Sequence, residues 1–311
     1  MAIRADGTLW GWGLNTSGQV GDGTTSNVLV PKQIGSATDW NAVSCGSTHT
    51  LAIKNGGELW SWGQASNGRL GNGTTTPSVT TPARIGAATN WTAVSAYSGQ
   101  SLALKGSGEL WAWGSNSFGA TGLGTSVGNT TSPTQVGSAT DWFYIAAGNA
   151  FGAALKGAGE LWTWGLATNG RLGNNTTTPD VLSPAQIGAA TDWALVSCGN
   201  ANAAALKTNG ELWTWGGSTN GILANGTNTP DVLVPAKVTE SDAFSYVSVV
   251  AGSGYNGVGI SRGQRAAWGA NASYALGLGI ITTNMTVPTN GAEALDWTAV
   301  ACGQAFGVGI V

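Results

Sequence analysis

Short apolar runs separated by glycine-rich links fill the chain, and one stretch shows the pattern. "WTAVSA" (91–96) alternates apolar with small or polar residues, "SLALK" (101–105) is a second short run, and "ELWAWG" (109–114) follows the link "GSG". Side chains two positions apart share one face of a strand, and short links that contain glycine are typical of β-hairpins. A long polar loop then leads to a fourth run such as "TPARIG" (81–86), whose proline suits a sheet edge. The pattern predicts four strands per unit and no sustained helix.

This four-strand unit recurs along the whole chain. The second tryptophan of a Trp-x-Trp-Gly motif, or its counterpart, falls at Trp12, Trp62, Trp113, Trp164, Trp215 and Trp268, in steps of 50, 51, 51, 51 and 53 residues. Asp or Asn followed by tryptophan is a second marker, at Trp40, Trp91, Trp142, Trp193 and Trp297, and we expect Tyr246 to hold the matching place in the fifth unit. The spacing predicts a single domain over 1–311 with repeat units at about 2–51, 52–102, 103–153, 154–204, 205–258 and 259–311.

Composition narrows the classes of function. The chain has 50 glycines and 16 tryptophans but only 9% charged residues, and its formal net charge is -3. Glycine without a triplet period excludes collagen, and the apolar content excludes a disordered chain. The 12 Lys and Arg residues form no cluster, so we expect no nucleic-acid binding. No apolar run approaches the length of a membrane span, so we expect no membrane insertion.

Catalytic and metal-binding chemistry is poorly represented. His49 is the single histidine, and its place is taken by other residues in the other repeats. No metal-ligand set and no cofactor fingerprint is recognisable, so we expect no metal, no cofactor, no catalytic residue and no enzyme activity. A Ser-His-Asp set around His49 stays open as a remote hydrolase alternative. The odd number of cysteines argues against a disulfide framework, and we expect a small buried side chain at the repeat position shared by Cys45, Ala96, Ala147, Cys198 and Cys302.

The repeat predicts an all-β fold, a β-propeller. Four-stranded units repeat radially in propellers, whereas solenoids stack linearly and need atypical end repeats. "AIR" (2–4) matches the end of the second strand of the unit, and "FGVGIV" (306–311) ends on that same strand. We therefore expect six four-stranded blades of about 51 residues, closed by N- and C-terminal strands that share one blade. Residues 297–311 would supply the first two strands of that blade, and residues 8–35 the last two.

Three motifs resemble those of the regulator of chromosome condensation repeat family. The family's Gly-x-x-His-Ser-x-Ala-Leu segment appears as "GSTHTLAI" (46–53), its strand ending in Trp-Gly at Trp62-Gly63, and its Gly-x-Leu-Gly-x-Gly-Thr as "GRLGNGT" (68–74). The resemblance covers nearly the whole chain and implies a propeller that binds proteins. The family usually has seven blades and this sequence supplies six, so the chain is either a six-bladed ring or a piece of a longer array. The family's Ran-exchange or chromatin role is not expected, because the charged and basic contacts it needs are lacking.

The regular residues are interpreted as structural. Trp60 and Trp62 share one strand face, and we expect the tryptophans to pack between neighbouring blades rather than to form a row of sugar-binding platforms. Lysine and glutamate flank the same hairpin turn in four repeats, as at Lys54 and Glu58. We expect these two residues to pair across the strands at an exposed edge.

Positions at which the repeats disagree are the candidates for binding. The loop after the first strand of each unit should lie at one mouth of the propeller, and aromatic groups there are typical of protein interfaces. The candidate binding face comprises His49, Tyr97, Gln100, Phe151, Asn202, Tyr255 and Phe306. The sixth unit is the most divergent, and an apolar loop on it suggests a second contact or an adjustment to ring closure. Its candidate residues are Arg262, Arg265, Ile280, Ile281 and Met285.

Two readings of function remain. The favoured one is a non-enzymatic binding scaffold that engages a protein partner through one loop-lined face. The alternative is a structural or adhesive module of an extracellular or virion assembly, in which loop aromatics bind glycans. Uncharged Thr, Asn and Gly loops favour an extracellular or virion-associated location over the cytoplasm. The sequence leaves the oligomeric state and the identity of the partner undetermined.

Overall fold

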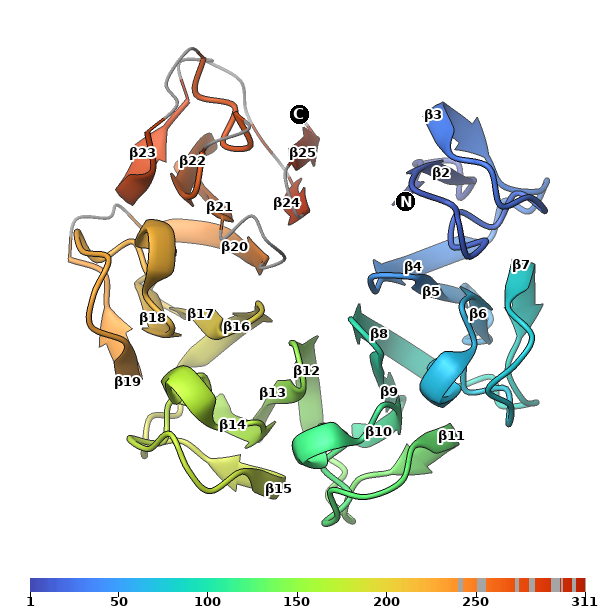
Figure 1. The fold of residues 1–311 in the computed structure, drawn as a ribbon, viewed down its shortest axis with the longest axis horizontal. Coiled ribbons are helices and arrows are strands. Elements are labelled where there is room, and N and C mark those ends of the chain that lie inside the picture. Colours follow the sequence, from blue (N-terminus) through green and yellow to red (C-terminus); the bar gives the residue numbers. More distant parts are fainter. Residues whose placement is uncertain are drawn as a thin grey trace. The chain divides into compact units, whose positions relative to one another are not determined.

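A computed structural model describes residues 1–239, 243–250, 256–271, 274–279, 283–291, 297, 299–303 and 306–310. Its regular elements are β-strands and four short 3-10 turns. Residue contacts divide the chain into two compact units, Met1–Gly152 and Ala153–Val311. Each unit is built from antiparallel sheets that follow one another in chain order (Figure 1). The expectation of short strands without ordinary helices holds for the described part of the chain.

The first unit contains three sheets and one further strand. The first sheet has the order β1 (Ala2–Ile3), β2 (Leu9–Gly13), β3 (Val28–Gln33). The second has the order β4 (Trp40–Cys45), β5 (His49–Lys54), β6 (Leu59–Gly63), β7 (Val79–Arg84). The third has the order β8 (Trp91–Tyr97), β9 (Gln100–Lys105), β10 (Glu109–Gly114), β11 (Thr130–Gln135). The 3-10 turns η1 (Ser66–Gly68) and η2 (Ser117–Gly119) follow β6 and β10, and β12 (Trp142–Ala147) follows β11.

The second unit repeats the same order. The boundary falls within β13 (Phe151–Lys156), and β14 (Glu160–Gly165) then pairs with β15 (Val181–Gln186). Two complete sheets follow: β16 (Trp193–Cys198), β17 (Asn202–Lys207), β18 (Leu212–Gly216), β19 (Val232–Lys237), and then β20 (Phe244–Val250), β21 (Asn256–Ser261), β22 (Gln264–Gly269), β23 (Met285–Asn290). A pair, β24 (Ala299–Gly303) and β25 (Phe306–Ile310), ends the chain. The turns η3 (Thr168–Gly170) and η4 (Thr219–Gly221) follow β14 and β18.

The Trp-Gly pair of each repeat marks a β-bulge. In the second sheet the pairing of β6 with β7 shifts between Ser61 and Gly63, so that Trp62 falls inside the irregularity. Gly63 has a φ of 102°, and a Cβ atom placed on it would lie 2.4 Å from the carbonyl oxygen of Thr48. Only glycine fits a position that combines a positive φ with so close an approach. The strand-ending Trp-Gly motif is therefore a requirement of the backbone.

Successive sheets pack through the first strand of the later sheet. In the first unit β8 lies against β4 and β5, and β12 lies against β8 and β9 (Figure 1). In the second unit β20 lies in the same way against β16 and β17. Buried side chains from two successive repeats fill the space between the sheets, as with Leu51, Leu59 and Trp91 around Trp113. Each repeat thus completes its core with its neighbour, which is the expected property of a repeat architecture.

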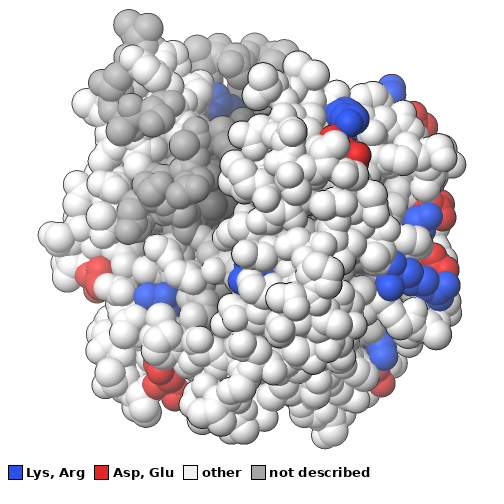
Figure 2. All heavy atoms as spheres, turned by 45° about the vertical axis from the view of Figure 1, so that its right-hand side comes forward, with Lys and Arg blue, Asp and Glu red and all other residues white. Residues whose placement is uncertain are grey.

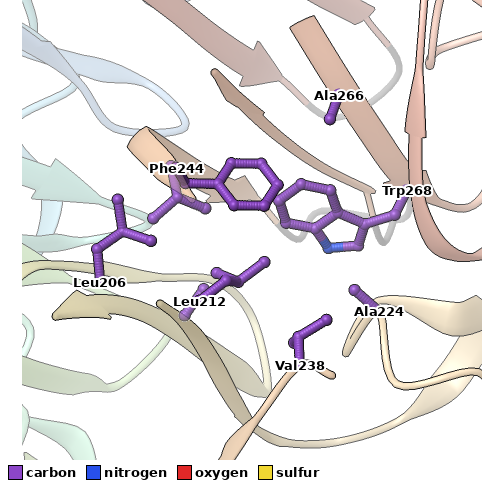
Figure 3. Packing of buried hydrophobic residues seen from close by; sticks show 9 residues of the cluster. Leu206, Leu212, Ala224, Val238, Phe244, Ala266 and Trp268 are labelled. Carbon is purple, nitrogen blue, oxygen red and sulfur yellow. The ribbon is translucent and has the colours of Figure 1, made fainter. Parts of the chain in front are cut away.

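The fifth repeat departs from the sequence prediction by two residues. Phe244, not Tyr246, stands where the other repeats have the tryptophan of Asp-Trp, because the bulge between Phe244 and Tyr246 matches the bulge between Trp193 and Leu195. The Phe244 ring meets Trp268 edge-on at 6.1 Å between ring centroids. Figure 3 shows both rings among buried side chains of the preceding repeat: Leu206, Leu212, Ala224 and Val238.

Candidate interaction face

The loop between the first and second strands carries the predicted binding face, but its key side chains point inward. His49 and Phe151 are fully buried, and Gln100 and Asn202 are only 2% exposed. Each of them opens the second strand of its sheet. The expectation that these four side chains face a partner directly is therefore wrong, although a binding role of the loops stays a prediction. Tyr97 is half-buried, Tyr255 lies outside the described residues, and the side chain of Phe306 does as well.

His49 has a defined structural role in its loop. Its Nε2 lies 3.0 Å from the Ser101 hydroxyl oxygen, and that hydroxyl donates its one proton to the carbonyl of Arg69 at 2.8 Å. Nε2 must therefore carry a proton and donate it to Ser101, which leaves Nδ1 as a buried acceptor without a partner. Burial, and then the positive charge of Arg69, lowers the pKa of His49 from 6.5 to about 3. A neutral, enclosed imidazole of this kind is unsuited to proton transfer at neutral pH.

The glycine before this loop makes room for the buried side chain. A Cβ atom placed on Gly46 would lie 2.3 Å from Cε1 of His49, and one placed on Gly148 would lie 2.2 Å from Cε1 of Phe151. The residues that remain accessible are therefore those between the glycine and the buried position. In the first loop Ser47 is exposed and Thr48 is half-buried.

In four motifs the second tryptophan donates a hydrogen bond to a carbonyl of the preceding repeat. Trp62, Trp113, Trp215 and Trp268 are completely buried. The Nε1 of Trp113 donates to the carbonyl of Arg69 at 2.9 Å, and the Nε1 of Trp62 donates to that of Gln19 at 3.0 Å. Both acceptors lie in the turn region of the previous repeat. The interpretation of these tryptophans as packing between blades is confirmed for the described repeats.

The periodic lysines have partners other than those expected. Lys54 Nζ lies 3.0 Å from Asp39 and 4.9 Å from the ring centroids of both Trp40 and Trp60. Glu58 instead pairs with Arg84 at 2.8 Å. The predicted Lys54–Glu58 side-chain pair is therefore wrong. Two aromatic rings and the Asp39 carboxylate together stabilise the Lys54 cation.

The cysteine position is less uniform than expected. Cys198 is buried and Cys45 is exposed, while the side chain of Cys302 lies outside the described residues. Burial raises the pKa of the Cys198 thiol, so that this group stays protonated. The prediction of a small buried residue holds at Cys198 and is wrong at Cys45.

The second predicted contact region is only partly described. Arg265 donates hydrogen bonds to the carbonyls of Leu276 and Gly277, and its guanidinium lies 5.8 Å from the ring centroid of Trp297. Met285 is half-buried and packs against the core of the second unit. Arg262 is exposed and has a φ of 51°. Ile280 and Ile281 lie outside the described residues. Arg265 and Met285 thus make contacts within their own unit, and a contact role of the region stays a prediction.

Sequence reasoning missed an exposed aromatic on the third repeat. Phe118 is 47% exposed and has a φ of 61°, a left-handed conformation that is unusual for a bulky side chain. The equivalent positions in other repeats are Asn67, Asn169 and Asn220, and asparagine tolerates this backbone well. Val127, in the same long loop, is 79% exposed. Comparison of the repeats could have found Phe118, because it replaces a regular asparagine.

Phe118 and Val127 lie at the same end of their sheet as the β8–β9 loop. Gln100 opens β9 and pairs with Gly114, which closes β10, and Gly114 also pairs with Thr130 at the start of β11. Phe118 follows Gly114 by one short turn, and Val127 precedes Thr130 by three residues. We call the exposed residues at this end of the third sheet, with Thr48 and Arg69 of the second, the loop face.

Charged groups are few on the surface and many of them are paired. Figure 2 shows mostly uncharged residues, with Lys and Arg atoms beside Asp and Glu atoms. Lys32 contacts Asp22 at 2.7 Å. This contact and the Thr24 hydroxyl hold the pKa of Asp22 at about 2.

In the described part of the chain no group of three His, Cys, Asp or Glu side chains is placed to hold a metal ion. Within the same residues, no helix has the length and apolarity needed to cross a membrane.

Comparison with known proteins agrees with this architecture. The crystal structure of human WBSCR16 superposes with a TM-score of 0.86 at 25% identity, over 99% of this chain and 82% of that one. Yeast RCC1 (Prp20) gives a TM-score of 0.62 at 20% identity, over 99% of this chain and 90% of that one. The fold is accordingly an all-β propeller of six antiparallel blades, as predicted, although the sharing of one blade by the terminal strands stays a prediction.

The family model for the regulator of chromosome condensation (RCC1) repeat matches residues 6–53, 56–104, 107–155, 158–206 and 209–258. The chain belongs to the RCC1 repeat family, which confirms the resemblance seen in its motifs. It is 27% identical to human E3 ubiquitin-protein ligase HERC2 over 290 residues, and 31% identical to the Arabidopsis thaliana ultraviolet-B receptor UVR8 over 219 residues. These matches cover 90% and 68% of this chain but only 6% of HERC2 and 48% of UVR8.

Proposed function

We propose that this chain is a non-enzymatic module that binds a protein partner through the loop face, with Phe118 as an anchor. The observation that carries the proposal is the backbone of Phe118. A non-glycine residue in the left-handed region is strained by about 1–2 kcal/mol relative to its ordinary conformations. The ring gains little burial in return, since 47% of the residue stays exposed. Such strain at an exposed aromatic is typical of a functional position.

Family members support a protein partner in general terms. Yeast RCC1 (Prp20) has a solved structure in which it is bound to Kap60, and binding to Gsp1p and histones is described for the same protein. HERC2 is an E3 ligase, but this chain corresponds to a small part of its length. A binding role of the repeat region is the property that fits all these relatives. Glycan binding and an extracellular or virion-associated location rest on the sequence alone and remain predictions.

The test uses two exposed phenylalanines of equal exposure. Phe118 and Phe143 are each 47% exposed. Phe143, however, lies at the start of β12, away from the loop face. Its neighbour Trp142 donates its backbone N–H to the Gly108 carbonyl, in the β9–β10 turn at the opposite end of the third sheet. Phe118→Asn and Phe143→Thr each introduce the residue that another repeat has at that position, Asn67 and Thr92. Wild type and both variants are used to isolate partners from extracts of the source organism.

Loss of partners with Phe118→Asn alone is the expected result. An anchoring aromatic contributes about 2 kcal/mol or more, so the affinity for a recovered partner should fall roughly 30-fold or more. The thermal stability of Phe118→Asn should equal or exceed that of wild type, because asparagine relieves the strain. An unchanged partner list with Phe118→Asn, or loss only with Phe143→Thr, would contradict the proposal.

A further inference from the structure

Arg69 is a nearly buried cation without an anion. It is 8% exposed, and none of the ion pairs in the described part of the chain includes it. Burial lowers the pKa of the guanidinium. A charged group taken out of water is unfavourable unless a counter-charge or hydrogen bonds compensate for it.

The hydrogen bonds of Arg69 all go to neutral acceptors. Its Nε donates to the Ser66 carbonyl at 2.9 Å, and its Nη1 donates to the Thr48 hydroxyl at 2.7 Å. A longer contact of 3.4 Å joins Nη1 to the Ser98 carbonyl. Nη2 takes part in none of these bonds, and the residue as a whole is 8% exposed. One edge of the guanidinium is thus held in place, while one nitrogen remains to bind a further group.

The β8–β9 loop packs beside this nitrogen. A Cβ atom placed on Gly99 would lie 3.2 Å from Nη2 of Arg69 and 3.4 Å from Cβ of Ser115. Glycine at position 99 therefore lets the loop pack closely against the guanidinium of Arg69 and against Ser115. Ser115 begins the segment that leads through Ser117, with a 3.4 Å contact between the two hydroxyls, to the exposed Phe118. The cation and the aromatic anchor belong to the same loop face.

Arg171 has the equivalent position in the fourth repeat, but the hydrogen bonds of its Nη2 differ from those of Arg69. Its Nη2 donates to the Thr168 hydroxyl at 3.0 Å and to Oδ1 of Asn169 at 3.3 Å. In the second repeat the corresponding amide oxygen, Oδ1 of Asn67, instead accepts a hydrogen bond from Asn129. The same motif therefore satisfies the guanidinium internally in one repeat and leaves it available in the other.

The fold does not require arginine at this position. The first, third and fifth repeats have Gln19, Ala120 and Ile222 there. A guanidinium nitrogen forms short, charge-assisted hydrogen bonds to carboxylate oxygens, which are stronger than those to neutral acceptors. We infer that Arg69 binds an Asp or Glu side chain of the protein partner, in a segment whose apolar neighbour packs on Phe118. This inference deepens the proposed function and rests on the same face.

The experiment uses two random 12-residue peptide libraries, one with a fixed central Glu and the other with Gln at that place. Both are selected on the wild-type chain, and the affinities of enriched peptides are measured by calorimetry. We expect enrichment from the Glu library only. Arg69→Gln should weaken those peptides at least 10-fold, and Arg69→Lys should restore only part of the loss. The matched control Arg171→Gln should leave the affinity unchanged.

The outcomes separate this inference from the proposed function. Peptides that depend on Phe118 but bind Arg69→Gln as well as wild type would overturn the carboxylate site and leave the proposed function standing. Peptides from the Glu library that depend on Arg69 but not on Phe118 would support the carboxylate site and contradict the anchor. Equal enrichment from the two libraries, or from neither, would also overturn the inference. Because Gln19 has the same position in the first repeat, Arg69→Gln should fold, which thermal unfolding checks.

Discussion

The imidazole Nε2 of His49 lies 3.0 Å from the hydroxyl oxygen of Ser101, which belongs to the next sheet. This contact joins two residues that are 52 positions apart in the sequence. The Ser101 hydroxyl in turn donates a hydrogen bond to the Arg69 carbonyl. The only histidine of the sequence is therefore part of the packing between successive repeats. The equivalent position is buried in five repeats, so its burial is a property of the architecture. These residues are His49, Gln100, Phe151, Asn202 and Asn256.

Acid should destabilise the chain through His49. Its folded-state pKa of about 3 lies below the ordinary value of 6.5, so the unfolded chain binds the proton more readily. The stability associated with the neutral imidazole is present above about pH 6.5 and is lost as the pH falls towards 3, by at most about 1.4 kcal/mol per pH unit. His49→Gln introduces the residue that Gln100 provides in the next repeat. Between pH 7.5 and about 4.5, thermal unfolding should shift less for His49→Gln than for wild type. Equal shifts in the two proteins would show that His49 is not the group responsible.

The two tryptophans of one motif should differ in their contribution to stability. Trp113 is fully buried and donates to the Arg69 carbonyl, whereas Trp111 is half-buried and contacts Glu109 at its own hairpin. Trp113→Phe leaves a cavity and removes one of the two hydrogen bonds to the Arg69 carbonyl, and should cost about 2–3 kcal/mol. Trp111→Phe should cost about 1 kcal/mol or less. Urea unfolding of the two variants measures the difference, and a larger loss with Trp111→Phe would reverse the assignment of the buried member.

Replacing the glycine of a 3-10 turn should reduce stability for two reasons: the strain of its positive φ, and a clash between the new side chain and the neighbouring repeat. Gly68 has a φ of 75°, and a Cβ atom placed on it would lie 2.6 Å from Cα of Thr131 in the next sheet. Gly86 has a similar φ of 63° but nothing within 4 Å of such an atom. Gly86→Ala should therefore destabilise by about 1 kcal/mol, through backbone strain only. Gly68→Ala should add about 1–3 kcal/mol for displacing the strand. Thermal unfolding of both variants provides the comparison; equal losses would mean that the sheets adjust freely to the extra atom.

Much of the fold could be predicted from the sequence because it depends on patterns within short segments of the chain. Alternation with period two, short glycine links and a repeat of about 51 residues are all properties of contiguous segments. They predicted the strands and the packing role of Trp62 and Trp113, while the family was indicated by the resemblance of three motifs. The Trp-Gly pair was visible as a motif, although its cause, the close approach of the Thr48 carbonyl to Gly63, appears only in the structure.

The sites were harder to predict because exposure depends on contacts between repeats. His49 and Gln100 vary among repeats as surface residues do, yet both are buried against groups distant in sequence. The sequence by itself determined the strands, the repeat and the family, since each depends on residues close together along the chain. Only the tertiary structure decided which variable residues face solvent, that Lys54 pairs with Asp39, and that Phe118 and Arg69 share one loop face. The physical reason is that burial, charge pairing and backbone strain are set by neighbours about one repeat away, and a single repeat read alone does not contain them.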